Sequence, residues 1–174
     1  NTYCNYFFFH VLILLFFHKK LSVGNVYKVW NGIFFLMDAA KKQELKRFIN
    51  ELRSIRGRHT ELVSVYIPAG YDLNKIIGHL QEEQGTAKNI KDAKTRGNVI
   101  DSLERCIRHL RLFKKTPSNG LAVFAGNVAA QEGKVDIKIW SIEPPEPLNM
   151  RMYRCDQRFV LDVLEEMREH KEVY

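Results

Sequence analysis

The sequence predicts an α+β fold: a mixed sheet of about four strands covered by helices, with a long helical hairpin that carries a polar turn. Three observations lead to this prediction. Apolar residues recur at helical spacing in four segments. Four shorter segments are rich in β-branched and aromatic residues or alternate between apolar and polar side chains. Glycine, proline and capping residues separate them in the order α-β-α-α-β-β-β-α, which suits helices packed on a small sheet.

The first helix and the first strand have clear boundaries. Asp38 caps a helix whose apolar residues recur from 45 to 55, and Gly57 ends it. The β-rich segment over 62–67 stops at Pro68, because proline cannot continue a central strand.

The next two segments predict the helical hairpin. Asp72 begins a helix with its apolar residues on one face, and Gly85 is expected to break it. A longer helix carries an apolar stripe from 99 to 110 and ends before Pro117. The polar residues between the two helices form a turn.

The carboxy-terminal part predicts three strands and a last helix. A turn over 117–120 leads into the first of these strands, and alternation of apolar and polar residues marks the second. A stiff loop with three prolines precedes the third strand. The predicted segments are strands over 121–125, 135–139 and 152–155 and a helix over 159–167.

Composition limits the possible functions. The chain has 174 residues, 45% of them hydrophobic and 27% charged, which is ordinary for one globular domain. Three cysteines without a CxxC pair exclude a disulfide framework and a CxxC-type zinc site, and six scattered histidines suggest no metal. The formal net charge of +7 favours an anionic partner. No cofactor is expected.

The first 36 residues differ from the rest. Residues 1–37 hold seven of the 11 phenylalanines, three lysines and no acidic residue. The apolar run over 6–17 is too short for a membrane-spanning helix, which needs about 20 residues. We interpret 1–36 as an atypical extension outside the natural protein, which would begin at Met37. A membrane anchor or a structured extension are the alternatives.

Three polar segments stand out within the predicted fold. Asn89–Asp92 forms the turn of the hairpin, where lysine can reach a phosphate and an amide can reach a base edge. Gly57–Glu61 joins the first helix to the first strand and offers hydrogen-bonding groups for a purine. In Tyr153–Phe159, alternate strand residues point to one face. An ordinary solvated turn, a helix end and core residues are the alternative readings of the three.

Together these segments resemble the amino-terminal domain of the archaeal and eukaryotic class I peptide chain release factors, in its archaeal form. Asn89–Asp92 matches the NIKS motif of the family with aspartate in the last position, and Tyr153, Cys155 and Phe159 match YxCxxxF. The segment over 58–62 occupies the place of the GT-containing loop. The resemblance covers about residues 37–167, and 168–174 would begin the linker to a middle domain.

The resemblance implies translation termination, with recognition of the stop codons UAA, UAG and UGA in the ribosomal A site. Asn89 and Lys91 are then candidates for the first uridine, and Thr60, Glu83, Tyr153 and Cys155 for the two purines. The full set of implied stop-codon or mRNA-binding residues is Asn89, Ile90, Lys91, Asp92, Thr60, Glu61, Glu83, Tyr153, Cys155 and Phe159. Candidate contacts to ribosomal RNA are Lys94, Arg96 and Arg105.

The same resemblance implies what this chain does not do alone. The family hydrolyses peptidyl-tRNA through a GGQ loop, and no GGQ occurs here, so we expect a decoding fragment without catalytic residues. The implied partners are the ribosome, the mRNA stop codon, ribosomal RNA and, through a carboxy-terminal domain, a translational GTPase. A cytoplasmic location without a membrane is expected.

Two departures from the family pattern keep alternatives open. His59 replaces a loop glycine, and Asp92 adds a negative charge beside the turn. A module that docks on the ribosome without reading stop codons would accommodate both. A membrane-tethered RNA-binding domain, with the apolar run over 6–17 as its anchor, is a second alternative. An enzyme that uses Cys106 or Cys155 is a third alternative, in which Arg154 and Arg158 lower the pKa of Cys155.

Overall fold

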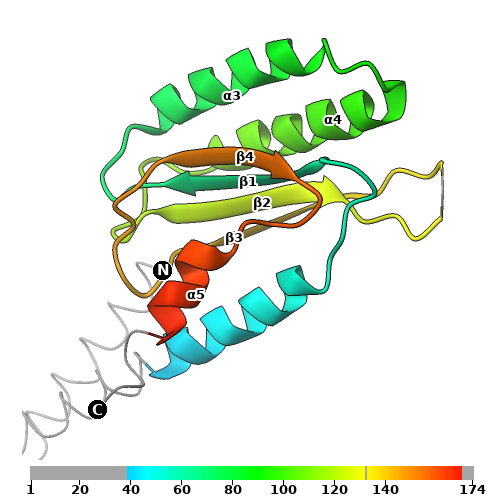
Figure 1. The fold of residues 1–174 in the computed structure, drawn as a ribbon. Helices are drawn as coiled ribbons and strands as arrows, with labels where there is room; N and C mark the ends of the chain where they lie inside the picture. Colours follow the sequence, from blue (N-terminus) through cyan, green and yellow to red (C-terminus); the bar gives the residue numbers. More distant parts are fainter. Residues whose placement is uncertain (1–38, 132, 170–174) are drawn as a thin grey trace, which may run out of the picture. The chain divides into compact units, whose positions relative to one another are not determined.

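The computed structural model describes residues 39–131 and 133–169 (Figure 1). The predicted extension over 1–36, the Asp38 cap and most of the predicted linker lie outside the described residues, so these expectations stay untested. Within the described ranges, no helix combines the length and the apolar character needed to cross a membrane.

Four strands form a single sheet in the order β3-β2-β1-β4. All three neighbouring pairs are antiparallel, so the predicted four-stranded α+β fold is confirmed with a sheet that is antiparallel rather than mixed. The connection between β1 and β2 explains the direction of this pair. Two antiparallel helices bring the chain back to the end of the sheet where β1 finishes, so β2 begins beside the end of β1 and runs in the opposite direction. The strands are β1 (Leu62–Ile67), β2 (Leu121–Asn127), β3 (Ile137–Ile142) and β4 (Met152–Asp156).

Helices cover both faces of this sheet (Figure 1). The hairpin of α3 (Leu73–Ala87) and α4 (Ala93–Leu110) lies on one face. The helix over 39–53 and α5 (Asp162–Glu169) lie on the other, where Arg53 Nη2 and Glu165 Oε1 are 2.6 Å apart. The order of the described elements is the one that the sequence predicts.

The central strand β1 is buried on both faces, and its side chains alternate between two cores. Val63 and Val65 pack with the α3–α4 hairpin, whereas Leu62 and Tyr66 pack toward helix 39–53 and α5. The Tyr66 hydroxyl donates to the Val160 carbonyl at 2.6 Å. Burial raises the pKa of Tyr66, so this phenol stays neutral and serves as a fixed donor.

The helix that was predicted to break at Gly85 continues to Ala87. A glycine inside a helix costs about 1 kcal/mol relative to alanine. Ala87 is only 6% exposed, and it packs in the core beneath the hairpin. The backbone N–H of Asn89 still donates to the Thr86 carbonyl at 3.0 Å. Burial of Ala87 therefore outweighs the local signal of Gly85.

Two boundaries in the carboxy-terminal part also differ from the prediction. Val135 is 60% exposed and lies outside β3. The Asn127 carboxamide oxygen accepts from the backbone N–H of Asp136 at 2.9 Å, which makes this stretch part of the β2–β3 loop. Phe159 lies in the segment before α5 rather than in the helix.

The predicted turn before β2 depends on Gly120, whose φ is +84°. Its backbone N–H donates to the Pro117 carbonyl at 3.0 Å. A Cβ atom at this position would lie 2.4 Å from the Ile67 carbonyl oxygen. Glycine is thus required both by the backbone angle and by the close approach of the neighbouring strand.

Candidate nucleic-acid interface

The three segments singled out in the sequence meet at one end of the sheet, on the right in Figure 1. β1 begins there and β4 ends there, because Leu62 pairs with Asp156. The turn between α3 and α4 reaches the same end, where Asp92 and His59 line one cleft. Strand register and the hairpin therefore bring together residues that are far apart in the chain.

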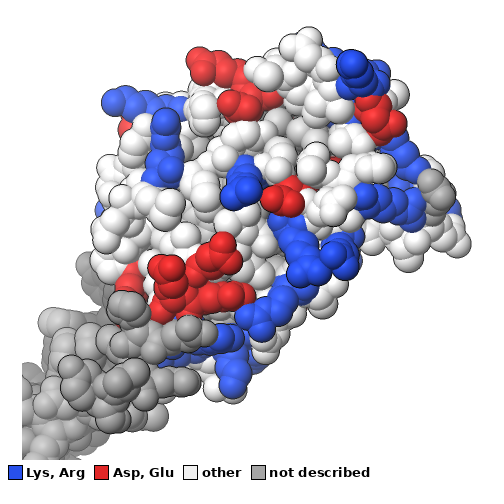
Figure 2. Space-filling view, viewed as in Figure 1, with Lys and Arg blue, Asp and Glu red and all other residues white. Residues whose placement is uncertain are grey.

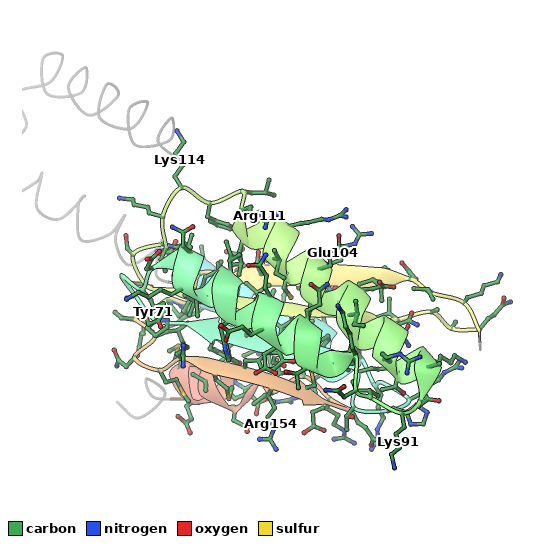
Figure 3. The ribbon with its side chains drawn as sticks, turned by 90° about the horizontal axis from the view of Figure 1, so that it is seen from above. Tyr71, Lys91, Glu104, Arg111, Lys114 and Arg154 are labelled. Atoms are coloured by element: carbon green, nitrogen blue, oxygen red, sulfur yellow. The ribbon has the colours of Figure 1, made fainter. Side chains whose placement is uncertain are left out.

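The turn between α3 and α4 is anchored from inside. Ile90 is half-buried against the core, and its carbonyl accepts from Arg96 Nη1 at 2.8 Å. Asn89 and Lys91 are exposed, and Lys91 points away from the body of the domain (Figure 3). The turn thus presents an amide and an ammonium group to solvent on a fixed backbone.

Asp92 is the N-cap of α4. Its carboxylate accepts from the backbone N–H of Thr95 at 2.7 Å. This bond, with smaller contributions from His59 and Lys94, holds the pKa of Asp92 below its usual value. Serine caps helices in the same way. The aspartate therefore keeps the structural role of the family's serine while it adds a negative charge.

Four side chains form a cluster between α3 and the edge strand β4. The Tyr153 hydroxyl and the Cys155 sulfur are hydrogen-bonded at 3.1 Å. The ring of His79 meets the Tyr153 ring edge-on at 6.0 Å between centroids. His79 Nε2 lies 4.0 Å from Glu83 Oε1. His79, Glu83 and Tyr153 line a small cleft of about 240 Å³, and Cys155 is joined to this group through its bond to Tyr153.

Burial favours the neutral thiol at both cysteines among the described residues. Burial raises the pKa of Cys155, contrary to the expectation that neighbouring arginines would lower it. Arg154 points to the other side of the strand, where its Nε lies 3.6 Å from Asp156 Oδ2. Cys106 is fully buried, and its pKa is raised to about 12. Burial also raises the pKa of Tyr153, so its hydroxyl keeps its proton.

Phe159 lies apart from the other members of its motif. It is 6% exposed and packs in the core on the helix 39–53 side of the sheet. Its ring meets Phe124 at 5.5 Å and Trp140 at 5.6 Å between centroids. Tyr153 and Cys155 pack on the opposite side, against the α3–α4 hairpin. The motif therefore contains two residues on the hairpin side of the sheet, Tyr153 and Cys155, and one core residue on the other side, Phe159.

The segment before β1 contains one exposed and one buried candidate. Thr60 is exposed. Glu61 is only 3% exposed, and both of its carboxylate oxygens are engaged. Oε1 accepts from the Arg58 backbone N–H at 3.0 Å, and Oε2 accepts from Asn98 Nδ2 at 2.6 Å. Glu61 thus fixes the conformation of the loop over 58–61 through buried contacts to the Arg58 backbone and to Asn98.

Asn98 and Asn127 extend this contact into a network that sequence reasoning missed. Asn127 Nδ2 donates to Asn98 Oδ1 at 3.2 Å, and Asn98 is only 4% exposed. Asn127 Oδ1 accepts from the backbone N–H of Ala129 at 3.0 Å. The chain Glu61–Asn98–Asn127, whose first two members are buried and whose third is half-buried, therefore connects the loop before β1, helix α4 and the β2–β3 loop. A polar residue, Asn98, on the buried face of α4 is the sequence signal for it.

The three candidate contacts to ribosomal RNA lie in different surroundings. Lys94 lines the same cleft as Asp92 and His59. Arg96 binds the Ile90 carbonyl of the turn. Arg105 lies about 16 Å from Lys94 along the axis of α4, from the rise of about 1.5 Å per residue. It lines a separate cleft whose other charged residues are Asp101, Glu104, Arg108 and Asp136.

Fold and site together define a class: a small four-stranded α+β domain in which a helical-hairpin turn and two adjoining loops form one polar end. A family model described as eRF1 domain 1 matches residues 40–169. The chain belongs to this family.

The relatives in this family are release factors. The chain is 60% identical over 136 residues to "Peptide chain release factor subunit 1" of Thermococcus kodakarensis, which covers 78% of this chain and 33% of that protein. It is 40% identical over 138 residues to the protein of the same name in Methanocaldococcus jannaschii, covering 79% and 33%. The chain thus spans about one third of the length of these curated relatives.

A solved structure supports the same assignment. The archaeal translation termination factor aRF1 is 36% identical and aligns with a TM-score of 0.67 over 74% of this chain and 35% of that one. The family resemblance expected from the three motifs is therefore confirmed, together with the fold.

Proposed function

We propose that this domain recognises stop codons in the ribosomal decoding site, as the amino-terminal part of a class I release factor. One observation carries the proposal: the turn over 89–92, the loop with Thr60 and the Tyr153–Cys155 pair lie at one end of a domain of the eRF1 family. RNA single strands are read through stacking and exposed base edges, and this end offers groups for both.

Each group has a role suited to its surroundings. Asn89 and Lys91 are exposed on an anchored turn, so they read the first uridine and its backbone. Glu83 accepts from the amino group of adenine, which guanine lacks at that position. Tyr153 and Cys155 stay protonated and provide neutral donors beside it.

Two of the candidate residues act indirectly in this proposal. Glu61 is buried with both oxygens bound, so it positions the backbone that presents Thr60. Phe159 supports the sheet from its other side. Asp92 caps α4 and thereby fixes the end of the turn.

The proposal extends to the partners of the whole protein. A stop codon is read within the ribosome, so the partners are mRNA and ribosomal RNA in the cytoplasm. In this proposal, peptidyl-tRNA hydrolysis and binding of a translational GTPase belong to the two thirds of the relatives' length that this chain does not cover.

The test is peptide release by a chimera. The chain is joined to the remaining two thirds of the Thermococcus kodakarensis factor, and release is measured on archaeal ribosomes programmed with UAA, UAG, UGA or the sense codon UGG. Release is expected at stop codons only. Lys91→Ala and Tyr153→Ala abolish it, whereas Lys114→Ala, at the other end of the hairpin (Figure 3), leaves it unchanged.

A folded chimera that binds ribosomes but releases peptide at no codon would contradict the proposal. The domain would then dock without decoding, and His59 and Asp92 would be the first residues to revert to the family pattern.

A further inference from the structure

A second cleft lies at the polar end of the domain, on the side of the turn that bears Asp92. Its volume is about 580 Å³. Its walls come from three segments: the loop between helix 39–53 and β1, the first turns of α4, and the β2–β3 loop. The lining residues that bear charge or can gain it are Arg56, Arg58, His59, Glu61, Asp92, Lys94 and Lys134.

The charge of this cleft is predominantly positive. Four permanent cations, two from the loop before β1 and one from each other wall, face two carboxylates. Both carboxylates are already engaged: Glu61 is bound to Asn98 and to the Arg58 backbone, and Asp92 caps α4. Figure 2 shows basic side chains gathered along helix 39–53 and toward the end where the three segments meet, with acidic ones over α5.

Hydrogen bonds join the three walls of the cleft. The Glu61–Asn98–Asn127 chain links all three walls, and Arg58 Nη2 donates to the Ala130 carbonyl across it at 3.3 Å. A buried carboxylate and amide are costly unless every group is bonded. Among the described residues that are not exposed, no buried side-chain nitrogen or oxygen is without a partner. The walls are thus fixed before any ligand arrives.

This cleft contrasts with the smaller one beside Tyr153. There, the charged residues are Glu83 and Arg151, and the rest are apolar or aromatic apart from His79. One side of the turn therefore suits base edges, and the other suits a ligand that carries repeated negative charge. A nucleic-acid backbone supplies such charge at regular spacing.

We propose that the cleft lined by Arg56, Arg58, Lys94 and Lys134 binds the phosphodiester backbone of an RNA strand. The choice of RNA over an acidic peptide rests on the proposed function, since the cleft shares Asp92 with the codon-reading turn. The strand is either the mRNA beyond the codon, which is single-stranded, or a helix of ribosomal RNA.

The test uses the 174-residue chain and fluorescence anisotropy over a range of salt concentrations. The probes are fluorescein-labelled decauridylate, which contains no stop triplet, an RNA hairpin with a paired stem, and decaglutamate. The test variant is Arg56→Gln/Lys134→Gln, and the matched control is Lys114→Gln/Lys115→Gln, which removes the same charge at the other end of the hairpin. All four side chains are exposed.

The test variant is expected to bind RNA roughly tenfold more weakly than the wild-type chain at 0.1 M salt. Its slope of log affinity against log salt should fall by about 1.4 on single strands, since each phosphate contact accounts for about 0.7. The control variant Lys114→Gln/Lys115→Gln should keep most of the RNA affinity and most of the salt slope of the wild-type chain. Stronger wild-type binding of decauridylate identifies the mRNA as the source, and stronger binding of the hairpin identifies ribosomal RNA.

Three results would overturn the proposal: equal losses in both variants, no RNA binding by the wild-type chain even at low salt, or tighter binding of decaglutamate that the test variant loses. The release assay separates the two proposals. A chimera that fails to release peptide while the chain still binds RNA through the cleft contradicts codon recognition alone.

Discussion

The two sides of the α3–α4 turn share a backbone but differ in chemistry. On one side, Tyr153 and Cys155 are partly buried, protonated and joined to each other. On the other, cations from three segments surround a wider cleft held by buried amides. In the two proposals, the neutral donors of the first side discriminate between bases, whereas the charges of the second side hold a strand of any sequence. The difference teaches that these two tasks would require different surroundings.

The largest effect is expected from breaking the network under the basic cleft. Asn98→Leu removes a donor to Glu61 and leaves a buried carboxylate oxygen unsatisfied. We expect a loss of about 3 kcal/mol in the free energy of unfolding. Urea denaturation measures it.

Asn89→Leu is the matched control, because Asn89 is exposed on the turn at the same end of the domain. It should change the free energy of unfolding by less than about 0.5 kcal/mol. Equal stability of the two variants would show that the buried chain does not hold the walls.

Tyr153→Phe tests the base-reading side. The substitution removes the hydroxyl that bonds Cys155 and keeps the ring beside His79. Release by the chimera at stop codons should fall about tenfold, the equivalent of one hydrogen bond of about 1.4 kcal/mol. Affinity for decauridylate should stay unchanged. A parallel loss of both would mean that the two sides do not have separate roles.

Asp92 lies between the two sides and predicts a pH dependence. The pKa of Asp92 is lowered in the folded state. Its contribution to stability is therefore present above the unfolded value of about 4 and is lost as pH falls through the lower folded value. Asp92→Ser should abolish this dependence while it keeps the melting temperature near neutral pH. Asp92→Ala should lower that temperature by roughly 3 °C.

Calorimetry from pH 2 to pH 7 distinguishes these variants. Identical acid profiles for the wild-type chain and Asp92→Ser would show that the charge of the cap contributes nothing.

The smallest effect concerns the last turn of α3, which both sides share. A Cβ atom at Gly85 meets nothing within 4 Å, so Gly85→Ala should raise the free energy of unfolding by roughly 0.5–1 kcal/mol. Neither RNA affinity nor release should change. Gly120→Ala is the opposite control, since a Cβ there collides with the Ile67 carbonyl. Destabilisation by Gly85→Ala would mean that this turn needs its glycine.

Local signals were sufficient for the order of the elements and for the hairpin turn. Capping by Asp72, the apolar stripe of α4 and the glycine of the turn before β2 all act within a few residues. They failed at Gly85, where burial of Ala87 decides how far the helix continues. The prediction of a mixed sheet was wrong for a related reason. Whether two strands pair parallel or antiparallel depends on the path of the chain between them, which local signals do not record.

The candidate site was harder to predict than the fold. Motif spacing grouped Tyr153, Cys155 and Phe159. The structure joins the first two by a hydrogen bond and places Phe159 on the other face of the sheet. The bond between Glu61 and Asn98 links residues 37 positions apart. No periodicity records such a contact, since it exists only after the hairpin has packed on the sheet.

The direct pairing of β1 with β2 has one more consequence. The α3–α4 hairpin leaves the sheet and returns to it between two neighbouring strands, so it is an arm inserted into a strand pair. A full helical turn added to both helices beside the tip would move residues 89–92 outward by about 5.4 Å without shifting any strand. The distance of the turn from the sheet can therefore change in evolution through the length of α3 and α4 alone, independently of the side chains that the turn carries.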